Sequence, residues 1–297
     1  MSWRINILGS GAIGGLCAAG AHKAKLTYRC FVRQGRNPLR YAEELDGQIT
    51  TLDYASNDSY PLSDSDLLIM PLKAFQLEDA LRQWQGKISL NTPVLLLHNG
   101  MGGVELARDI IPDNPVLLAT TSHGALKLNA DTVKHTGLGS TMLGMAFHHP
   151  RAPSLQNQLT PIMEACIGPV TWRDDMHNAL WQKLLINCAI NPLTALADVK
   201  NGELSHASYR PTLQAICEEV CLTAQAFGIF IDAKSALEQV LNVIENTAEN
   251  YSSMHQDIAH KRPTEIDAIN GYVVKQAQKK GIDVPVNTQM LLAIKAL

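Results

Sequence analysis

The sequence predicts an α/β fold in two parts: an N-terminal Rossmann-type domain with a parallel sheet, and an all-α C-terminal domain. Short apolar runs alternate with helix-like segments through the first half, which is the pattern of βαβ units. These runs cover residues 4–8, 27–32, 66–70, 94–97 and 116–120. After Trp172 the strand signals stop and the periodicity becomes helical. We therefore expect a first domain over residues 1–172 and a helical domain over residues 173–297.

Each further element is expected from a local pattern. Shorter strands at residues 132–135, 140–145 and 169–172 would close the first domain. Helices are expected at residues 176–196, 212–227, 233–247 and 264–280. The last of these opens with Thr264 three residues before Asp267, which is a capping pattern, and stops at Gly281.

The composition is that of a globular protein with neither a nucleic-acid nor a membrane partner. Hydrophobic residues make up 46% of the 297 positions, and 25 lysines and arginines stand against 28 acidic residues. A nucleic-acid-binding surface needs a stronger basic excess, and no apolar segment is long enough to cross a membrane. We expect the glycine-rich run at residues 5–21 to belong to the first domain and not to a signal peptide.

The six cysteines indicate a reducing compartment. They form no CxxC pair and are too sparse for a disulfide scaffold, so we expect a cytoplasmic location. Cys217 and Cys221 share a predicted helix face, but no histidine stands at ligand spacing, and we expect no metal site.

A glycine motif follows the first expected strand. Gly9, Gly11 and Gly14 spell GxGxxG between that strand and a helix of small residues at 12–22. In this context the first glycine allows a tight turn, the second lets a pyrophosphate approach the backbone, and the third lets the helix pack closely. The alternative is a glycine-rich turn without a ligand. The expected dinucleotide contacts are Gly9, Ser10, Gly11, Ala12, Ile13 and Gly14.

The end of the second strand indicates which dinucleotide binds. An NAD site places Asp or Glu there to bind the ribose 2′-hydroxyl, whereas this sequence has Phe31, Val32 and Arg33. A guanidinium pairs with a 2′-phosphate, so NADP(H) is favoured over NAD(H). Arg36 and Arg40 are alternatives for this role, and Arg33 could instead be a solvated loop charge.

Two more strand ends carry polar side chains. Lys73 follows the third strand in MPLKAFQ, and Asn99 follows the fourth in LLLHNGMGG. Ligands of doubly wound sheets bind beyond the carboxyl ends of the strands, so both residues are candidate cofactor contacts. The alternative for Asn99 is a simple turn, because Asn-Gly is a common turn dipeptide.

A stripe of polar residues interrupts an apolar helix in the second half. In ALWQKLLINCAINPLTAL, Lys183, Asn187 and Asn191 are four residues apart and share one helix face. Buried amines and amides need partners, and a polar substrate would be one. Burial lowers a lysine pKa, which suits Lys183 to donate a proton to a ketone that accepts hydride from NADPH. Alternatively, Lys183 reaches solvent and the two amides bond to neighbouring backbone.

Together these motifs resemble one family over nearly the whole chain. GSGAIGG, PLKAFQ, LLLHNGMGG, ALWQKLLINCAINPLTAL, NGELSH, ENYSSMHQDI and RPTEIDAINGYVV look like the 2-dehydropantoate 2-reductases, or ketopantoate reductases. The resemblance implies a Rossmann domain joined to a helical domain of the 6-phosphogluconate dehydrogenase-like type. It also implies NADPH-dependent reduction of ketopantoate to pantoate, a step of pantothenate and coenzyme A biosynthesis.

The resemblance implies roles for individual residues as well. Lys183 matches the proton donor, Glu265 in PTEID an acidic residue on the cofactor side, and Ser253 the carboxylate partner. Without the family, Glu265 is a carboxylate in the first turn of a helix, where it needs no ligand. The implied cofactor contacts are Lys73, Asn99, Ala125 and Glu265. The implied substrate contacts are Asn99, Lys183, Asn187, Asn191, Asn201, Asn250, Tyr251, Ser252 and Ser253.

Two other functions stay open at this point. One is a related NADP-dependent 2- or 3-hydroxyacid dehydrogenase that uses the same residues. The other is a non-catalytic module that senses NADP(H), although a sensor has no need of Lys183 on an apolar helix. We expect the partner to be a small 2-oxo acid, and both a monomer and a homodimer fit the sequence.

Overall fold

The computed structural model describes residues 3–33, 37–54 and 61–297, and contacts divide the chain into two units. The first contains Met1–His98 and Gly103–Met176, and the second contains Asn99–Gly102 and His177–Leu297. The expected boundary at residue 172 lies just before this division, in the segment that leads into α5 (Met176–Ala197). The short segment Asn99–Gly102 groups with the helical unit, which the sequence did not predict.

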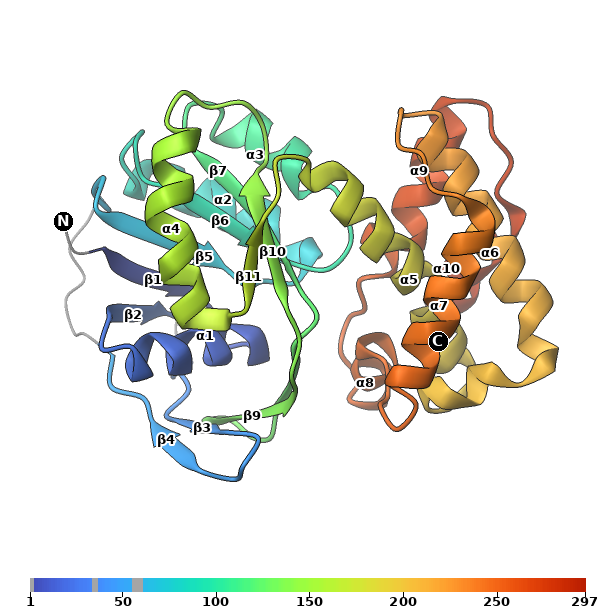
Figure 1. Cartoon of the computed structure of the whole chain (residues 1–297), viewed down its shortest axis with the longest axis horizontal. Coiled ribbons are helices and arrows are strands. Elements are labelled where there is room, and N and C mark those ends of the chain that lie inside the picture. Colours follow the sequence, from blue (N-terminus) through green and yellow to red (C-terminus); the bar gives the residue numbers. More distant parts are fainter. Residues whose placement is uncertain (1–2, 34–36, 55–60) are drawn as a thin grey trace. The chain divides into compact units, whose positions relative to one another are not determined.

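The first unit is built on a seven-stranded sheet (Figure 1). Its strand order is β11-β10-β7-β6-β5-β1-β2, and only the β10–β7 pair is antiparallel. The strands are β1 (Arg4–Leu8), β2 (Thr27–Phe31), β5 (Asp66–Met70), β6 (Val94–Leu97), β7 (Val116–Thr121), β10 (Thr141–Met145) and β11 (Val170–Trp172). The parallel core confirms the predicted Rossmann-type sheet.

A second sheet in the first unit was not predicted. The strand expected at 132–135 exists in this unit as β9 (Thr132–Gly137), and it belongs to a four-stranded sheet of order β4-β3-β9-β8. Its partners are β3 (Tyr41–Glu43), β4 (Ile49–Thr51) and β8 (Gly124–Lys127), none of which was predicted. These strands are short and mostly exposed or half-buried, so they carry no apolar run.

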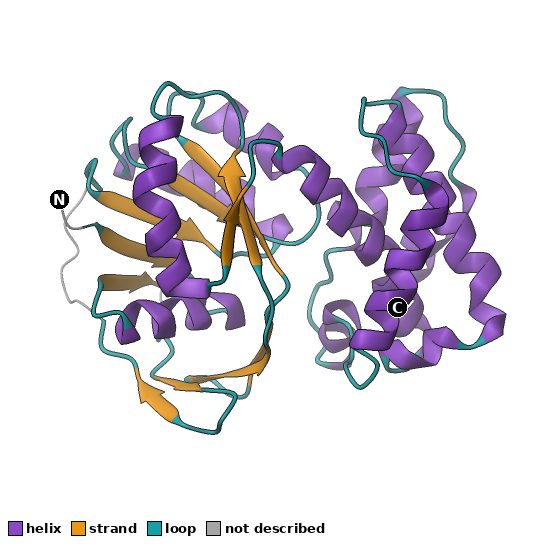
Figure 2. Cartoon of the chain, viewed as in Figure 1, coloured by secondary structure: helices purple, strands orange, loops and turns teal. Residues whose placement is uncertain are grey.

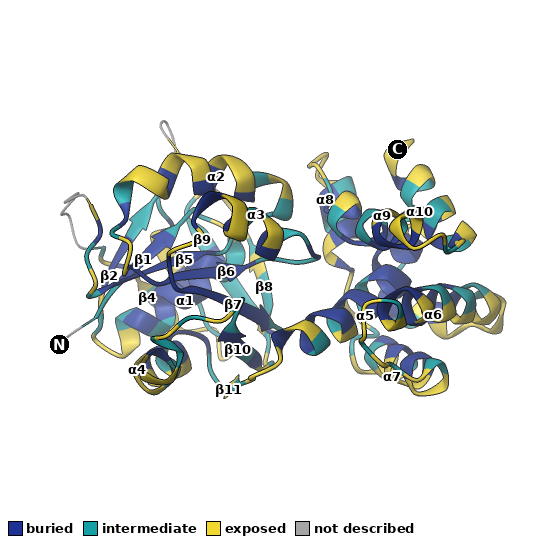
Figure 3. Ribbon diagram, turned by 90° about the horizontal axis from the view of Figure 1, so that it is seen from above, coloured by how far each residue is buried: buried dark blue, intermediate teal, exposed yellow. Residues whose placement is uncertain are grey.

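Helices cover both faces of the main sheet. On one face α1 (Ala12–Lys23) packs against α4 (Ala152–Ile167), and on the other lie α2 (Leu77–Trp84) and α3 (Gly103–Ile110) (Figures 1 and 3). The small residues of α1 permit this contact, because a Cβ on Gly20 would lie 2.3 Å from the carbonyl oxygen of Cys166 in α4.

The second unit is helical in every residue that has regular structure (Figure 2). Its α-helices are α5, α6 (Arg210–Gln225), α7 (Ala233–Asn246), α8 (Ser253–Ala259), α9 (Asn270–Lys279) and α10 (Pro285–Lys295). Helix α6 packs against α7 and α10, and α9 against α10. Short 3-10 turns lie at η3 (Asn201–Ser205), η4 (Ala207–Tyr209) and η5 (Ile266–Ala268). No helix among the described residues could span a membrane.

The prediction of a single helix over residues 264–280 was wrong. The chain forms the turn η5, leaves helical geometry at Ile269 (φ −104°, ψ −99°), and begins α9 only at Asn270. The buried Asn270 amide donates to the carbonyl of Cys188 and to Asn287 Oδ1, so tertiary contacts fix this break. The Thr264 hydroxyl accepts from the Ile266 N–H at 3.4 Å, and the residue at the N-cap of η5 is Glu265, so Thr264 does not cap α9 as expected.

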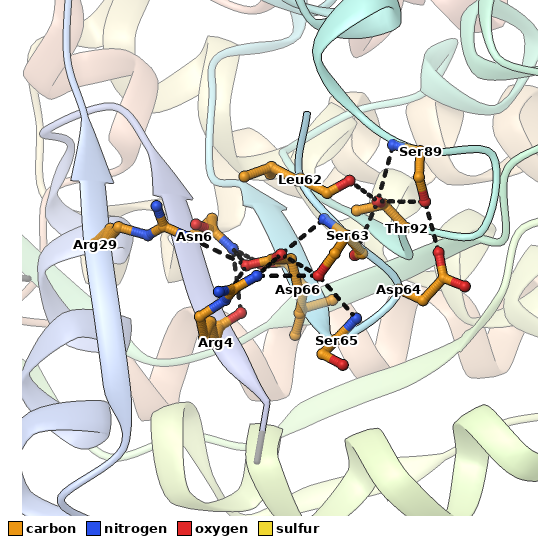
Figure 4. A network of polar contacts seen from close by, with 11 residues as sticks. Arg4, Asn6, Arg29, Leu62, Ser63, Asp64, Ser65, Asp66, Ser89 and Thr92 are labelled. Carbon is orange, nitrogen blue, oxygen red and sulfur yellow. Dashed lines mark hydrogen bonds and ion pairs between the residues drawn. The ribbon is translucent and has the colours of Figure 1, made fainter. Parts of the chain in front are cut away.

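A buried ionic cluster joins the first residues of β1 and β5 to β2 (Figure 4). Asp66 accepts from Arg4 Nε at 2.9 Å, from Arg29 at 3.2 Å and from Asn6 at 3.1 Å. Burial alone would raise the pKa of Asp66, but the hydrogen bonds from Arg4, Ser63 and Asn6 outweigh it and lower the pKa to about 2. The cluster lies at the amino ends of the strands, whereas Gly9, Arg33 and Lys73 follow their carboxyl ends.

Candidate active site

The glycine loop after β1 is shaped for a pyrophosphate. Gly9 has φ +108°, and its N–H donates to the carbonyl of Phe31 at 2.7 Å, which holds the loop against the end of β2. Gly11 caps α1 without a side-chain hydrogen bond, and the first turn of α1 contains no acidic residue. The N–H groups and dipole of this helix end therefore favour an anion, as a dinucleotide would supply.

Sequence reasoning missed a lysine beside this loop. Lys127 Nζ donates to the carbonyl of Ser10 at 3.0 Å from β8, the strand that also carries the predicted cofactor residue Ala125. The ammonium adds positive charge where phosphate oxygens would lie. Its only signal was its place in TTSHGALK, and pattern reasoning alone did not predict that this strand crosses the loop.

The other predicted cofactor residues of the first unit follow strand ends. Arg33 is exposed two residues after β2, Arg40 is also exposed, and Arg36 lies outside the described residues. Lys73 begins the turn η1 (Ala74–Gln76) after β5, and its backbone N–H donates to Gln76 Oε1 at 3.3 Å. Lys73 is only half-buried, so its side chain is partly accessible to a ligand.

Asn99 and Glu265 lie together in the helical unit. Asn99 Nδ2 donates to Glu265 Oε2 at 3.3 Å, although 166 positions separate the two residues. The Met101 N–H donates to the carbonyl of Ala268 at 2.8 Å, and a Cβ on Gly100 would lie 2.4 Å from that oxygen. Gly100 also has φ +76°, so this close approach requires a glycine. The loop after β6 is thereby packed on the turn η5.

The setting of Glu265 differs from the helix-dipole interpretation. It precedes η5, it is not in the first turn of a helix, and its side chain is only 4% exposed. A carboxylate this buried needs partners, and Asn99 is one of them.

Lys183 lies on α5 with an altered pKa. Burial of its ammonium lowers the pKa to about 8, and the charge of Glu265 partly opposes this shift. Asn187 is half-buried one turn later, and Asn191 is 6% exposed in the turn after that. The predicted stripe therefore lies on one helix, where a lysine with a lowered pKa is followed by two amides.

The remaining predicted substrate residues form a second group in the helical unit. The Asn201 N–H donates to the carbonyl of Asn250 at 2.9 Å, and its Nδ2 donates to Thr247 Oγ1 at 2.9 Å. Asn201 Oδ1 is buried without a hydrogen-bond partner among the described residues. Such an orphaned acceptor would be satisfied by a ligand that donates to it.

Tyr251, Ser252 and Ser253, at the start of α8, differ in exposure and in hydrogen bonding. The Ser252 hydroxyl accepts from the His255 N–H at 3.1 Å as the cap of α8, and it lies 2.7 Å from the hydroxyl of Thr194 on α5. Ser253 and Tyr251 are exposed. Ser252 therefore has a structural role within the protein, while Ser253 is exposed at the start of α8.

The geometry fits acid-assisted reduction. No group of three potential metal ligands occurs among the described residues. The residues that could hold a dinucleotide lie at strand ends of the first unit, and the helical unit brings Asn99 and Glu265 together and couples Glu265 to the ammonium of Lys183.

Two protein-family models match the chain, one in each of its two units. Family models described as "Ketopantoate reductase PanE/ApbA" and "Ketopantoate reductase PanE/ApbA C terminal" match residues 5–146 and 175–297. A protein named 2-dehydropantoate 2-reductase from Vibrio cholerae serotype O1 is 39% identical over 293 residues, covering 99% of this chain and 97% of that protein. One of the same name from Bacillus subtilis (strain 168) is 32% identical, with 99% and 97% covered.

Solved structures show the same fold over the full length. A probable 2-dehydropantoate 2-reductase from Bacillus subtilis has a TM-score of 0.82 and 28% identity, with 99% of both chains covered. D-mandelate dehydrogenase with NADH and anilino(oxo)acetate has a TM-score of 0.89 and 24% identity, with 99% and 97% covered.

Proposed function

The chain belongs to the ketopantoate reductase PanE/ApbA family, and from this premise we propose that it reduces 2-dehydropantoate (ketopantoate) to pantoate with NADPH. In this proposal the reaction serves pantothenate and coenzyme A biosynthesis. Relatives that carry the name 2-dehydropantoate 2-reductase align over nearly the whole of both chains, which supports the assignment. A nicotinamide cofactor fits the glycine loop of the first unit.

The chemistry that this chain supplies is a proton and a charged environment. NADPH, when bound, provides the hydride for the ketone carbon. Lys183 Nζ gives its proton to the ketone oxygen as negative charge develops there, and the neutral amine regains a proton from water. A pKa of about 8 keeps the amine mostly protonated at neutral pH, while making it a stronger acid than an ordinary lysine.

The other residues would bind and orient the two ligands. Asn99 and Glu265 form one hydrogen-bonded pair, in which Glu265 also favours the protonated form of Lys183. The proposed substrate contacts are Asn99, Lys183, Asn187, Asn191, Asn201, Asn250, Tyr251, Ser252 and Ser253. The proposed cofactor contacts are Gly9, Ser10, Gly11, Ala12, Ile13, Gly14, Arg33, Lys73, Asn99, Ala125 and Glu265. Ser252 would contribute through the backbone, because its hydroxyl is used as a cap.

The choice of NADPH over NADH rests on Arg33. It is an exposed cation directly after β2, where a carboxylate would repel a 2′-phosphate. Arg40 is the alternative cation among the described residues.

The location and assembly of the protein are part of the proposal. All six cysteines are free thiols, which is the usage expected in a reducing cytoplasm. The chain would act as a monomer or a homodimer, and a structural neighbour from Staphylococcus aureus is described as a dimeric ketopantoate reductase.

The observation that carries the proposal is the placement in one unit of Lys183, on the apolar helix α5, with the buried Glu265 that accepts from Asn99; the lowered pKa of Lys183 supports it. Its test is steady-state NADPH oxidation with ketopantoate, 2-oxoisovalerate and phenylglyoxylate. We expect the highest kcat/KM with ketopantoate. A preference for phenylglyoxylate would instead favour a hydroxyacid dehydrogenase like the mandelate enzyme, and no oxidation with any 2-oxo acid would favour an NADP(H) sensor.

A further inference from the structure

A buried histidine connects the proposed substrate loop, residues 250–253, to the end of α5. His255 lies on α8, three residues after Ser252, and its side chain is about one-tenth exposed. Its Nε2 lies 2.7 Å from Oδ1 of Asp198. Asp198 is the first residue after α5 and adopts φ +55°, a left-handed conformation that points its carboxylate back toward α8.

Two further contacts fix the same histidine. The Tyr251 ring stacks on the imidazole with centroids 4.3 Å apart and planes 20° apart. The His255 N–H donates to the Ser252 hydroxyl, which in turn pairs with the hydroxyl of Thr194 on α5. One residue therefore touches the loop at Tyr251 and the end of α5 at Asp198.

The imidazole depends on Asp198 for its orientation. Nδ1 of His255 is buried without a hydrogen-bond partner among the described residues, so the ring is anchored through Nε2. A buried imidazole that loses this bond would have two unsatisfied nitrogens. The Asp198 carboxylate is exposed, so the pair contributes orientation of the ring more than stability.

We propose that the Asp198–His255 pair positions the 2-oxo acid substrate by fixing residues 250–253 relative to the polar face of α5. Asn187 and Asn191 lie on α5, and Asn250, Tyr251 and Ser253 lie on the loop that His255 secures. A polar ligand held by both groups requires a fixed spacing between them, because hydrogen bonds weaken steeply with distance and angle. His255 acts here as a positioning residue and makes no contact with the reacting atoms. This inference rests on the proposed function.

The test compares substitutions of this pair with one at the other end of α8. His255→Leu removes the Nε2 bond, and we expect the KM for ketopantoate to rise about 10-fold, because the loop that it positions would lose one hydrogen bond to the charged substrate. The kcat should change less than about threefold, and the NADPH dissociation constant should stay as in the wild type. His255→Gln keeps an N–H near the Nε2 position and should restore most of the KM.

The partner residue is tested in the same way. Asp198→Asn keeps an acceptor and tolerates the left-handed backbone, so its KM should stay near the wild-type value. Asp198→Gly removes the side chain without backbone strain and should raise the KM as His255→Leu does. The double variant of His255→Leu and Asp198→Gly should have the same KM as either single variant, because both substitutions break the same interaction. His260→Leu, an exposed histidine at the other end of α8, is the control and should leave the KM unchanged.

Several results would overturn the inference. A KM within about twofold of wild type for His255→Leu and Asp198→Gly would do so, as would additive effects in the double variant. An equal loss of NADPH affinity would indicate general damage and would equally refute the positioning role. If His255→Leu does not fold, the KM values of His255→Gln and of the two Asp198 variants test the inference in its place. Failure of the wild-type chain to reduce ketopantoate would refute the proposed function itself, and this inference with it.

Discussion

In the proposed reaction Lys183 donates a proton, so its pKa determines how readily it can act. An ordinary lysine has a pKa near about 10.4 and gives up its proton reluctantly at neutral pH. Burial of Lys183 lowers this pKa to about 8, and Glu265 limits the shift. In the proposed reaction these opposing effects would keep the ammonium charged and still make it a stronger acid than an ordinary lysine. Substitution of Glu265 alters one of the two effects alone.

Glu265 should set the pH range of the reaction. In Glu265→Gln the amide still accepts from Asn99, but the negative charge that raises the Lys183 pKa is lost. The pKa of Lys183 should fall further, so the loss of kcat/KM at alkaline pH should begin at a lower pH than in the wild type. The measurement is the pH profile of kcat/KM. Asp267→Asn, which neutralises an exposed carboxylate two residues away, is the control, and an identical shift there would refute the local effect.

Arg33 should discriminate between the two nicotinamide cofactors. Arg33→Ala should raise the KM for NADPH roughly 10- to 150-fold, because a charge-assisted contact to the 2′-phosphate is lost. The KM for NADH should change little. Arg40→Ala is the matched comparison, and a larger effect there would transfer the role to Arg40. Equal losses with both cofactors would show that Arg33 does not bind the 2′-phosphate.

The surroundings of site residues were predictable from sequence only where the pattern was local. The apolar helix around Lys183 predicts a lowered pKa, and burial on α5 acts in that direction. The contact between Asn99 and Glu265 spans 166 positions, and no periodicity encodes it. The use of Lys127 beside Ser10 was missed for the same reason, since the strand that carries it belongs to an unpredicted sheet.

At the scale of elements, the central strands of the main sheet were predictable, whereas β3, β4, β8 and α4 were not. The central strands β5, β6 and β7 are mostly apolar and buried. In contrast, β3 and β4 have three residues each, and α4 contains Pro161, which argues against a helix. The interrupted helix before α9 was not predictable, because buried contacts of Asn270 determine the break.

The packing of the loop after β6 on η5 gives an element-scale prediction. Gly100→Ala places a methyl group 2.4 Å from the carbonyl oxygen of Ala268, in addition to straining a positive φ. The loop should move away from η5 and separate Asn99 from Glu265, which should raise the KM for ketopantoate and lower the thermal midpoint. Gly102→Ala is the matched control, since Gly102 has φ +107° but its added methyl group would meet no described atom within 4 Å. Equal damage from both would mean that backbone strain alone matters.

The ionic cluster of β1, β2 and β5 predicts how stability depends on pH. The folded-state pKa of Asp66, about 2, is lower than that of an unfolded aspartate. Its contribution of roughly 2 kcal/mol to the free energy of unfolding is therefore present above about pH 4 and is lost as the pH falls toward about 2.

Asp66→Asn should remove this contribution together with the ion pairs that Asp66 forms with Arg4 and Arg29. The free energy of unfolding at neutral pH should therefore fall by about 2 kcal/mol or more. Urea unfolding of both proteins at several pH values checks this. The gap between wild type and variant should narrow at acid pH, and a constant gap would contradict the assigned cause.

At the scale of the whole molecule, the residues proposed for phosphate binding and for proton donation belong to different units. The glycine loop, Arg33, Lys73 and Ala125 belong to the first unit, whereas Lys183 and the amides belong to the second. The segment Asn99–Gly102 follows β6 in the chain but groups with the helical unit. A substitution at Lys183 should therefore impair proton donation and leave NADPH binding unchanged. A substitution that unfolds the protein would impair both.

Lys183→Ala provides the most direct measurement. NADPH oxidation with ketopantoate is followed for wild type and variant from about pH 6 to about pH 10, with NADPH affinity titrated by fluorescence. We predict that wild-type kcat/KM falls above about pH 8, because the amine must be protonated to act. The variant should bind NADPH normally, lose about 10² to 10⁴ in kcat, and lack that alkaline fall. A folded variant with kcat within about threefold of wild type would contradict the account.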